Sequence, residues 1–217
     1  MGSLTQIQRS VIIGSLLGDG YLRIVRGRKN ALLEINHSFN ARDYVDWKYA
    51  ILQSIAGRAP KMRHGNGQRI AYRFTTRQLS ELTQFHSVFY RDGKKTIPDD
   101  MKLDSIILAV WYMDDGSKCR EQDVYLNTQQ FSEKDQQKCR GMLAEMGIES
   151  FLNRDKIYWR LRIKKSSLPT FWKSITPYII PTMRYKLSYN PVETHPERKR
   201  RVELRHMPEL IRQPLSS

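Results

Sequence analysis

Cysteine is nearly absent from this chain of 217 residues, which contains only Cys119 and Cys139. Two cysteines cannot build a disulfide framework, and they lack the spacing of a zinc finger, so we expect a reducing intracellular compartment. The sequence does not distinguish a mitochondrion, a chloroplast and a prokaryotic cytoplasm. Long hydrophobic runs are also absent. No stretch approaches the roughly 18 apolar residues that a membrane span needs, so no membrane partner is expected.

Acidic residues are few compared with basic ones. The chain has 22 Asp and Glu against 37 Lys and Arg, a net charge of +15 and a pI near 9.9. This excess is larger than solubility requires and indicates a polyanionic partner, with nucleic acid favoured over the alternative of a merely basic enzyme. Hydrophobic residues make up 40% of the chain, enough for one compact domain or two fused subdomains.

One short pattern occurs twice. Residues 12–20 read IIGSLLGDG and residues 108–116 read LAVWYMDDG, each an apolar helical segment that ends in Asp-Gly. The two acids, Asp19 and Asp115, are 96 positions apart (115 − 19), so the repeat divides the chain into two halves of roughly domain size. The sequence therefore predicts a duplicated fold.

Hydrophobic periodicity and turn signals give the same order of elements in both halves, α-β-β-α-β-β-α, and an α+β fold class. The first half is predicted as helix Gln6–Leu17, strands Tyr21–Arg26 and Ala31–Phe39, helix Asp43–Ile55, strands Lys61–Arg63 and Arg69–Thr76, and helix Gln78–Phe89. The second is predicted as helix Asp104–Met113, strands within Val124–Gln129, helix Ser132–Met146, strands Ile148–Asn153 and Lys156–Lys164, and helix Ser167–Tyr178. The predicted units are 1–93, a linker 94–103, 104–187 and a basic C-terminal extension 188–217.

Two of the predicted strands carry basic side chains on one face. Ile157, Trp159, Leu161 and Ile163 are expected to face the core, while Lys156, Tyr158, Arg160, Arg162 and Lys164 alternate with them. Arg69, Ala71, Arg73 and Thr75 alternate with Ile70, Tyr72 and Phe74 in the same way. Exposed strand faces are often charged, but these two contain no acid, which favours a surface that contacts phosphates and bases.

A single Asp-Gly at a helix end has an ordinary explanation, because glycine supplies a left-handed C-cap. Two equivalent ends favour a site. Gly14 and Gly18 leave one helix face free of bulk, and a parallel second helix would then bring Asp19 and Asp115 side by side. Two carboxylates at the negative ends of two helices are costly unless a cation lies between them. Oxygen ligands with no His or Cys nearby in sequence suit Mg²⁺ better than Zn²⁺, and Mg²⁺ on a basic protein suggests phosphodiester hydrolysis.

These residues resemble the LAGLIDADG homing endonucleases, and in particular the single-chain members with two motif copies. The similarity covers roughly residues 7–190 and rests on IIGSLLGDGYL, LAVWYMDDGSK, KKTIP, LNTQQFS and PYIIPTMRYKL. The resemblance implies a pseudo-twofold monomer with the motif helices at the interface and antiparallel β saddles in the DNA major groove. Such proteins cut both strands of a long site across the minor groove and leave 3′ overhangs.

The resemblance also assigns residues. Asp19 and Asp115 correspond to the metal-binding catalytic acids, with backbone carbonyls of Gly18 and Asp114 beside them. Lys95 and Lys186 match the family's basic residues near the two sites, with Lys94 as a substitute. The candidate DNA-binding residues are Arg23, Arg26, Arg28, Arg69, Arg73, Gln129, Lys156, Tyr158, Arg160, Arg162 and Lys164. The implied cofactor is Mg²⁺, which Mn²⁺ is expected to replace, whereas Ca²⁺ is expected to support binding without cleavage.

The second motif departs from the first, because Val110 and Asp114 stand where the first has Gly14 and Gly18. The interface is therefore expected to be asymmetric, and the Asp114 side chain is either a ligand or a solvated acid. The predicted function is a Mg²⁺-dependent endonuclease specific for a long double-stranded DNA site. No protein-splicing blocks are visible, so it is expected to be intron-encoded. Two alternatives stay open: an RNA maturase that binds intron RNA, and a non-catalytic DNA-binding regulator.

Overall fold

The structure is a computed structural model that describes residues 4–65, 70–120 and 122–187. The predicted C-terminal extension, Arg69 and most of the Gly65-Asn66-Gly67 turn lie outside the described residues. No helix in the described part of the chain is long and apolar enough to cross a membrane.

The first half has the predicted order of elements. Its main elements are α1 (Gln6–Leu17), β1 (Tyr21–Ile24), β2 (Ala31–Ser38), α2 (Arg42–Leu52), β3 (Lys61–His64), β4 (Ile70–Thr75) and α3 (Ser80–Phe89). Helix α1 begins with a capping box between Thr5 and Gln8, which satisfies its free N–H groups. After α3, the short strands β5 (Tyr90–Arg91) and β6 (Lys94–Lys95) pair, so Lys95 is held against the first half although the sequence assigned it to the linker.

The second half repeats the order. Its main elements are α4 (Ser105–Asp115), β7 (Gly116–Arg120), β8 (Asp123–Leu126), α5 (Glu133–Glu145), β9 (Ser150–Asp155), β10 (Tyr158–Ile163) and α6 (Leu168–Ile175), followed by a 3-10 helix, η5 (Pro181–Lys186). The strand predicted to reach Gln129 ends at Leu126, so Gln129 lies in the following loop. Asp104 caps α4 and Ser132 caps α5.

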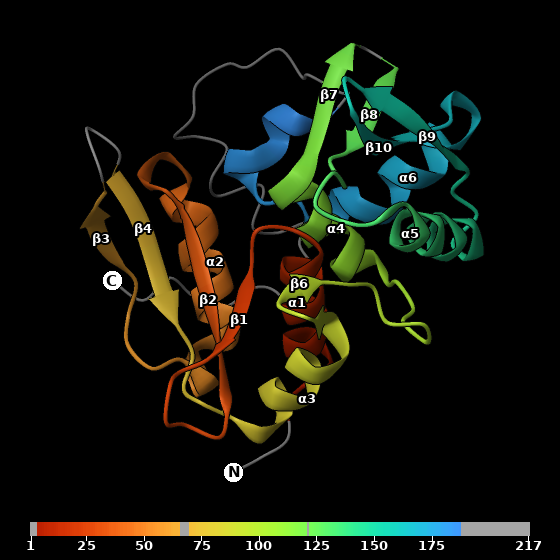
Figure 1. Ribbon diagram of the computed structural model, residues 1–217. Coiled ribbons are helices and arrows are strands. Elements are labelled where there is room, and N and C mark those ends of the chain that lie inside the picture. The colour runs from red at the N-terminus through yellow and green to blue at the C-terminus, as the bar shows by residue number, and fades with distance from the viewer. Residues whose placement is uncertain (1–3, 66–69, 121, 188–217) are drawn as a thin grey trace.

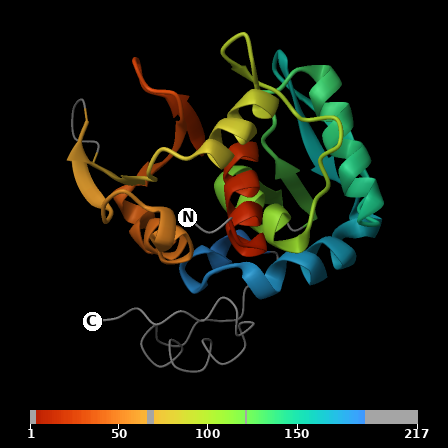
Figure 2. The same cartoon turned by 90° about the horizontal axis from the view of Figure 1, so that it is seen from below.

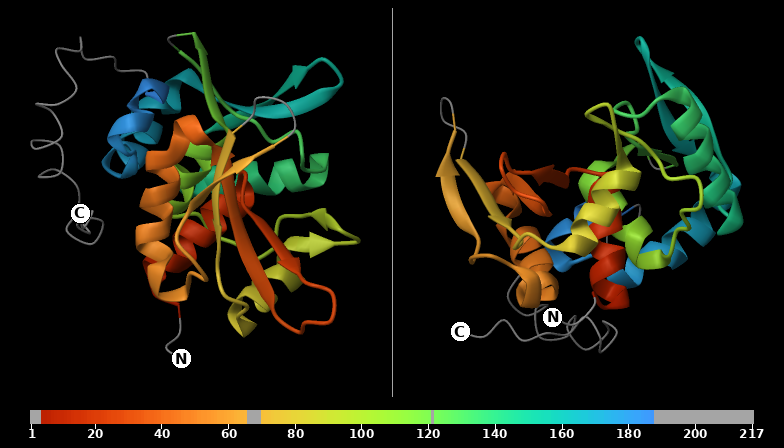
Figure 3. Two further views of the ribbon diagram at one scale, coloured as in Figure 1. Left: turned by 90° about the vertical axis from the view of Figure 1, so that its left-hand side faces the viewer. Right: turned by 60° about the horizontal axis from the view of Figure 1, so that its bottom comes forward.

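Each half forms one four-stranded antiparallel sheet, with the equivalent orders β1-β2-β4-β3 and β7-β8-β10-β9. Figures 1 and 3 show the two sheets splayed apart on either side of the central helices, with α2 against the first sheet and α5 against the second. No helix in residues 4–65, 70–120 and 122–187 covers the other face of either sheet (Figure 3). This pair of open faces is the predicted saddle.

Helices α1 and α4 lie against each other at the centre of the molecule (Figure 2). A Cβ on Gly14 would lie only 2.7 Å from the Ile107 carbonyl oxygen and from the Val110 Cβ, so the two backbones approach closely at glycine. Buried side chains of both helices join the same hydrophobic core. The predicted packing of the motif helices is confirmed, and it brings both Asp-Gly ends to one place.

Candidate active site

Both Asp-Gly ends have glycine because of close approach and not because of a left-handed cap. The glycines of the two Asp-Gly pairs are Gly20 and Gly116, and neither has a positive φ, so the left-handed explanation is wrong here. A Cβ on Gly18 would lie 2.4 Å from the Asp114 Cβ, and one on Gly116 would lie 2.1 Å from the Tyr112 ring. A side chain at Gly18 would force the ends of α1 and α4 apart, whereas one at Gly116 would displace the Tyr112 ring of α4 itself. A Cβ on Gly20 would lie 2.8 Å from Ser15, so this glycine too is explained by close approach.

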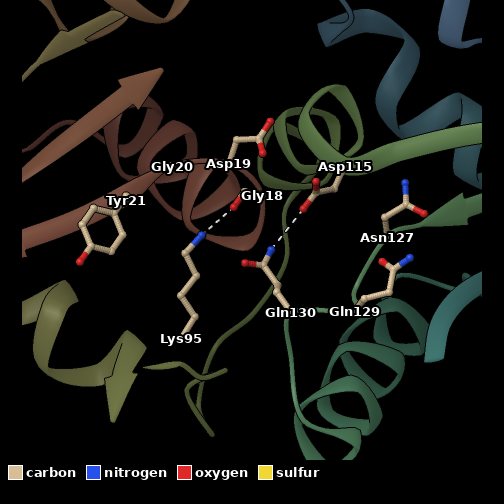
Figure 4. Close-up of a pocket in the computed structure, with 9 residues that line it drawn as sticks. All are labelled: Gly18, Asp19, Gly20, Tyr21, Lys95, Asp115, Asn127, Gln129 and Gln130. Carbon is tan, nitrogen blue, oxygen red and sulfur yellow. Dashed lines mark hydrogen bonds between the residues drawn. The ribbon is translucent and has the colours of Figure 1, made fainter. Parts of the chain in front are cut away.

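The ends of α1 and α4 line a common pocket of about 450 Å³. Its walls are Gly18, Asp19, Gly20, Tyr21, Lys95, Asp115, Asn127, Gln129 and Gln130, drawn in Figure 4. The side chains come from both halves, and the two catalytic candidates Asp19 and Asp115 stand on opposite helices of the interface. The pocket therefore holds carboxylates, carbonyls, amides and an ammonium group together.

Asp115 is the more enclosed of the two acids. Gln130 donates a hydrogen bond from Nε2 to Asp115 Oδ2 (3.2 Å) and another to the Leu17 carbonyl (3.2 Å), so it links the two helix ends (Figure 4). Burial, and then the negative charges of Asp19 and Asp114, raise the pKa of Asp115 to about 7. The sequence pointed to Gln129, which lines the pocket. Its neighbour Gln130, however, makes the hydrogen bonds to Asp115 and Leu17.

Each half places one lysine on the carbonyl oxygens at a helix end. Lys95 Nζ lies 2.6 Å from the Gly18 oxygen, and Lys186 Nζ lies 2.6 Å from the Met113 oxygen and 3.2 Å from the Asp114 oxygen. Burial lowers the pKa of Lys95 to about 8, against the raising effect of nearby carboxylates, and it also lowers that of Lys186. The carbonyl oxygens at both helix ends thus accept hydrogen bonds from ammonium groups, and the set of carboxylate and carbonyl oxygens fits a hard divalent ion.

Asp19 has different surroundings. Its side chain is 51% exposed, and its carboxylate lies 3.5 Å from His37 Nδ1, while His37 Nε2 lies 3.7 Å from Asp114 Oδ1. These three side chains lie close enough to be considered for a metal ion. The imidazole turns a different nitrogen to each acid, Nδ1 to Asp19 and Nε2 to Asp114. Burial, and then the charge of Lys48, lower the pKa of His37.

Asp114 is neither solvated nor free. Its side chain is fully buried, and Lys48, also fully buried, donates to Asp114 Oδ1 (2.8 Å) and Oδ2 (3.1 Å). The solvated-acid interpretation is therefore wrong. Sequence reasoning missed Lys48, although its position on the apolar face of α2, four residues after buried Tyr44 and before buried Leu52, signals a buried charge that needs a partner.

Five of the eleven predicted DNA-binding residues lie on the sheet strands, namely Arg23, Arg73, Tyr158, Arg160 and Arg162, and acids accompany the cations. Glu34 on β2 lies 3.2 Å from Arg73 and 3.4 Å from Arg23. Arg162 pairs with Asp123, and Lys164 lies 2.9 Å from Glu149. The two basic segments, 69–76 and 156–164, contain no acid themselves. The acids that pair with them come from the neighbouring strands β2 and β8 and from the loop before β9. The faces are thus less uniformly cationic than the strand patterns indicated.

Two tight turns hold further candidates. Lys156 has φ +56° in the turn between β9 and β10, so the alternation of faces breaks there, and Ile157 is 75% exposed in place of facing the core as predicted. Tyr158 is exposed beside it, and Arg160 stacks on the Tyr125 ring at 4.0 Å. Arg26 and Arg28 are exposed on either side of Gly27 in the β1–β2 turn.

The fold and the site together define a pseudo-twofold protein with paired acids at the ends of two interface helices. Comparison with known proteins gives the same class. Residues 9–171 match the model of the LAGLIDADG DNA endonuclease family, and the chain belongs to this family.

Named relatives fall into several kinds. The chain is 27% identical over 189 residues to the cytochrome b mRNA maturase bI2 of Debaryomyces hansenii (82% of this chain, 72% of that protein). It is 26% identical over 205 residues to the probable intron-encoded endonuclease 1 of Wickerhamomyces canadensis (87% of each). It is 31% identical over 204 residues to protein RecA of Mycobacterium gastri, covering 85% of this chain but only 48% of that protein.

A solved structure supports the fold. The homing endonuclease I-WcaI, bound to its DNA recognition sequence, superposes with a TM-score of 0.80 at 24% identity, over 88% of this chain and 90% of that chain. The homing endonuclease fold predicted from the sequence is confirmed.

Proposed function

We propose that this protein is a divalent-metal-dependent endonuclease that makes a staggered break in a long, specific double-stranded DNA site. The observation that carries the proposal is the pairing of Asp19 and Asp115 at the α1–α4 interface, with Lys95 and Lys186 on the adjacent carbonyls. A binding protein does not need two acids in a basic surface, since they repel phosphate. A nuclease needs them.

Asp19, Asp115 and the carbonyl oxygens of Gly18 and Asp114 would hold the metal, and Mg²⁺ suits this oxygen set. When bound, it supplies an activated water and a positive charge for the leaving oxygen. Gln130 keeps the Asp115 carboxylate directed into the pocket. Lys95 and Lys186 place positive charge where the phosphate gains negative charge in the transition state.

The two open sheet faces support duplex DNA as the substrate. They stand on either side of the pocket and carry Arg23, Arg73, Arg160 and Arg162 among other polar groups. A duplex that follows both faces would pass its backbones over the helix ends. The relation to an intron-encoded endonuclease, and to a homing endonuclease solved with its DNA site, supports an intron-encoded enzyme with a similar partner.

The first test selects duplexes from a randomised DNA pool with the protein in Ca²⁺, exchanges Ca²⁺ for Mg²⁺ and maps the cut ends. We expect staggered cuts with 3′ overhangs, and cleavage with Mn²⁺ as well. Asp19→Asn and Asp115→Asn, run in parallel, should bind the selected DNA but make no double-strand break. Normal cleavage by either variant would refute the mechanism, and selected binding without cleavage by the wild type would indicate a regulator.

RNA maturation is a second candidate, favoured by the similarity to cytochrome b mRNA maturases of two yeasts. A maturase would bind the structured intron RNA that encloses its own reading frame and assist its splicing. Competition between labelled intron RNA and the selected duplex, together with a splicing assay, separates the two functions. Faster splicing that survives Asp19→Asn would assign maturase activity to this chain.

A further inference from the structure

Lys48 and Asp114 form a buried ion pair that crosses between the two halves. Lys48 belongs to α2 in the first half and Asp114 to α4 in the second, and neither side chain is exposed to solvent. The ammonium group also lies 4.4 Å from the Tyr44 ring centroid. A buried pair of this kind costs desolvation energy in both partners, so it is a weak source of stability and calls for another explanation.

The Lys48–Asp114 pair also contacts the backbone of Asp19, one of the two candidate catalytic acids. Asp114 Oδ2 accepts a hydrogen bond from the backbone N–H of Asp19 (3.3 Å), and the Asp114 side chain fills the space that a Cβ on Gly18 would need. The carboxylate thus lies against the last turn of α1, beside the peptide that carries Asp19. Lys48 fixes its orientation by contacting both of its oxygens.

Helix α2 holds α4 at two points one turn apart. The Tyr44 hydroxyl donates to the Val110 carbonyl (3.2 Å), and Lys48, four residues later, binds Asp114, four residues after Val110. Residues four apart lie on one face of a helix, so the two contacts form a matched pair of anchors. They set the position of the α4 end relative to the first half.

The Lys48–Asp114 pair lies beside Asp19, and the residues that correspond to it in the repeat cannot form such a pair beside Asp115. The counterpart of Asp114 in the motif repeat is Gly18, which has no side chain, because both positions precede the Asp-Gly acid by one residue. Counted from the helix start, the counterpart of Lys48 in α5 is Cys139, a buried thiol. The pair therefore lies beside Asp19, and the part of the chain that the structure describes has no equivalent pair at Asp115.

We propose that Lys48 is a positioning residue for Asp19, acting through the Asp114 carboxylate, which is held as a hydrogen-bond acceptor across the interface and is not a metal ligand. The proposal rests on the endonuclease function proposed above. It gives the Asp114 carboxylate a structural role at one of the two sites that would each cut one DNA strand.

The test compares Lys48→Met, Asp114→Asn and the double variant with the wild type. Each single variant leaves one buried charge without its partner, whereas the double variant removes both charges and keeps an amide oxygen that accepts from the Asp19 N–H. Duplexes labelled separately on each strand report the two cutting rates in single-turnover reactions. Lys173→Met, an exposed lysine on α6, is the matched control and should behave as the wild type.

We expect Lys48→Met to slow one strand by about 10- to 100-fold relative to the other, so that nicked DNA accumulates. The double variant should recover most of that rate. An equal loss on both strands would mean that Lys48 only supports the fold. Loss of cutting by Asp114→Asn that the double variant does not recover would mean that the carboxylate is a metal ligand.

Hydrogen exchange of the Asp19 amide gives a readout that requires no cleavage. The amide should exchange about 10-fold faster in Lys48→Met and return toward the wild-type rate in the double variant. Unchanged exchange in Lys48→Met would overturn the positioning role. If the wild type cuts neither strand, the endonuclease proposal fails, and the exchange experiment still decides whether Lys48 orders the Asp19 peptide.

Discussion

The two acids of the site have unequal surroundings despite their equivalent places in the repeat. Asp19 is half exposed beside His37, whereas Asp115 is enclosed and bonded by Gln130. Each acid also differs in the residue before it, glycine in one motif and Asp114 in the other. At the scale of single residues, therefore, the pseudo-twofold symmetry is broken, and the two strands of a substrate would meet different chemistry.

Asp115 should make the metal-free protein less stable as the pH rises. Its pKa of about 7 in the folded state lies above the unfolded value near 4, so the folded protein retains the proton longer. The contribution of Asp115 to the free energy of unfolding is therefore greatest below about pH 4. It falls between about pH 4 and 7, and above that range the free energy of unfolding is lower by up to about 4 kcal/mol.

Chemical denaturation in EDTA at a series of pH values measures this effect. Asp115→Asn should flatten the fall, and Asp100→Asn, which removes an exposed carboxylate, should leave it in place. An Asp115→Asn profile that falls as steeply as that of the wild type would show that another group is responsible.

Lys95 should impose an alkaline limit on cleavage. Its pKa of about 8 means that the ammonium charge next to the Gly18 carbonyl is lost as the pH rises through 8. Single-turnover cleavage should therefore decline above about pH 8. Lys95→Met should lower the rate by about 100- to 1,000-fold and remove the decline, because the stabilising charge is already absent. Lys94→Met, at the exposed neighbouring position, serves as the control, and the decline should remain in it.

At the scale of elements, the α1–α4 pair decides the geometry of the site. Small residues on α1 let the helices approach until the two Asp-Gly ends share a pocket, and α2 reaches across to α4 through Tyr44 and Lys48. Because the acids stand at the helix ends, a change in helix separation moves both of them. Packing in the interface is therefore coupled to the distance between Asp19 and Asp115.

Gly14→Ala tests this packing. Its Cβ would lie 2.7 Å from the Ile107 oxygen and the Val110 Cβ, so the helices must move apart, at a cost of about 1–3 kcal/mol. Gly141→Ala in α5 is the matched control, because nothing lies within 4 Å of its Cβ and alanine favours a helix by about 1 kcal/mol. Urea denaturation should show opposite signs for the two variants. A destabilised Gly141→Ala or an unaffected Gly14→Ala would contradict the packing described.

At the scale of the whole molecule, the two halves are joined by a continuous core. Buried side chains of α1 and α4 belong to the same hydrophobic cluster as the interiors of both sheets, and Thr96 and Ile97 after β6 bond to Asp135 on α5. Neither half keeps its motif helix buried without the other. The open sheet faces then form one surface rather than two independent modules.

Unfolding should accordingly be a single transition. Scanning calorimetry of the wild type should give one peak whose calorimetric enthalpy equals the van't Hoff enthalpy. Two resolved peaks, or a van't Hoff enthalpy near half of the calorimetric value, would show that the halves unfold separately and that the interface contributes little cooperativity.

Much of this arrangement follows from local pattern. The element order, the approximate bounds and the pairing of Asp19 with Asp115 could be predicted, because apolar periodicity, caps and the repeated motif are local in sequence. The acids that accompany Arg73 and Arg162 could not, because they come from neighbouring strands whose register the sequence does not encode. The exposed position of Ile157 depends on a turn at Lys156 that breaks the alternation.

The sequence by itself determined that two helices end in adjacent acids within a basic, duplicated α+β chain, since motif spacing and periodicity specify these features directly. Only the tertiary structure decided the surroundings of each acid. Lys48 meets Asp114 across 66 residues, and Gln130 meets the Leu17 carbonyl across 113. Such contacts depend on how close the helices pack and on which side chain is left to fill the remaining space, and these are properties of the folded molecule.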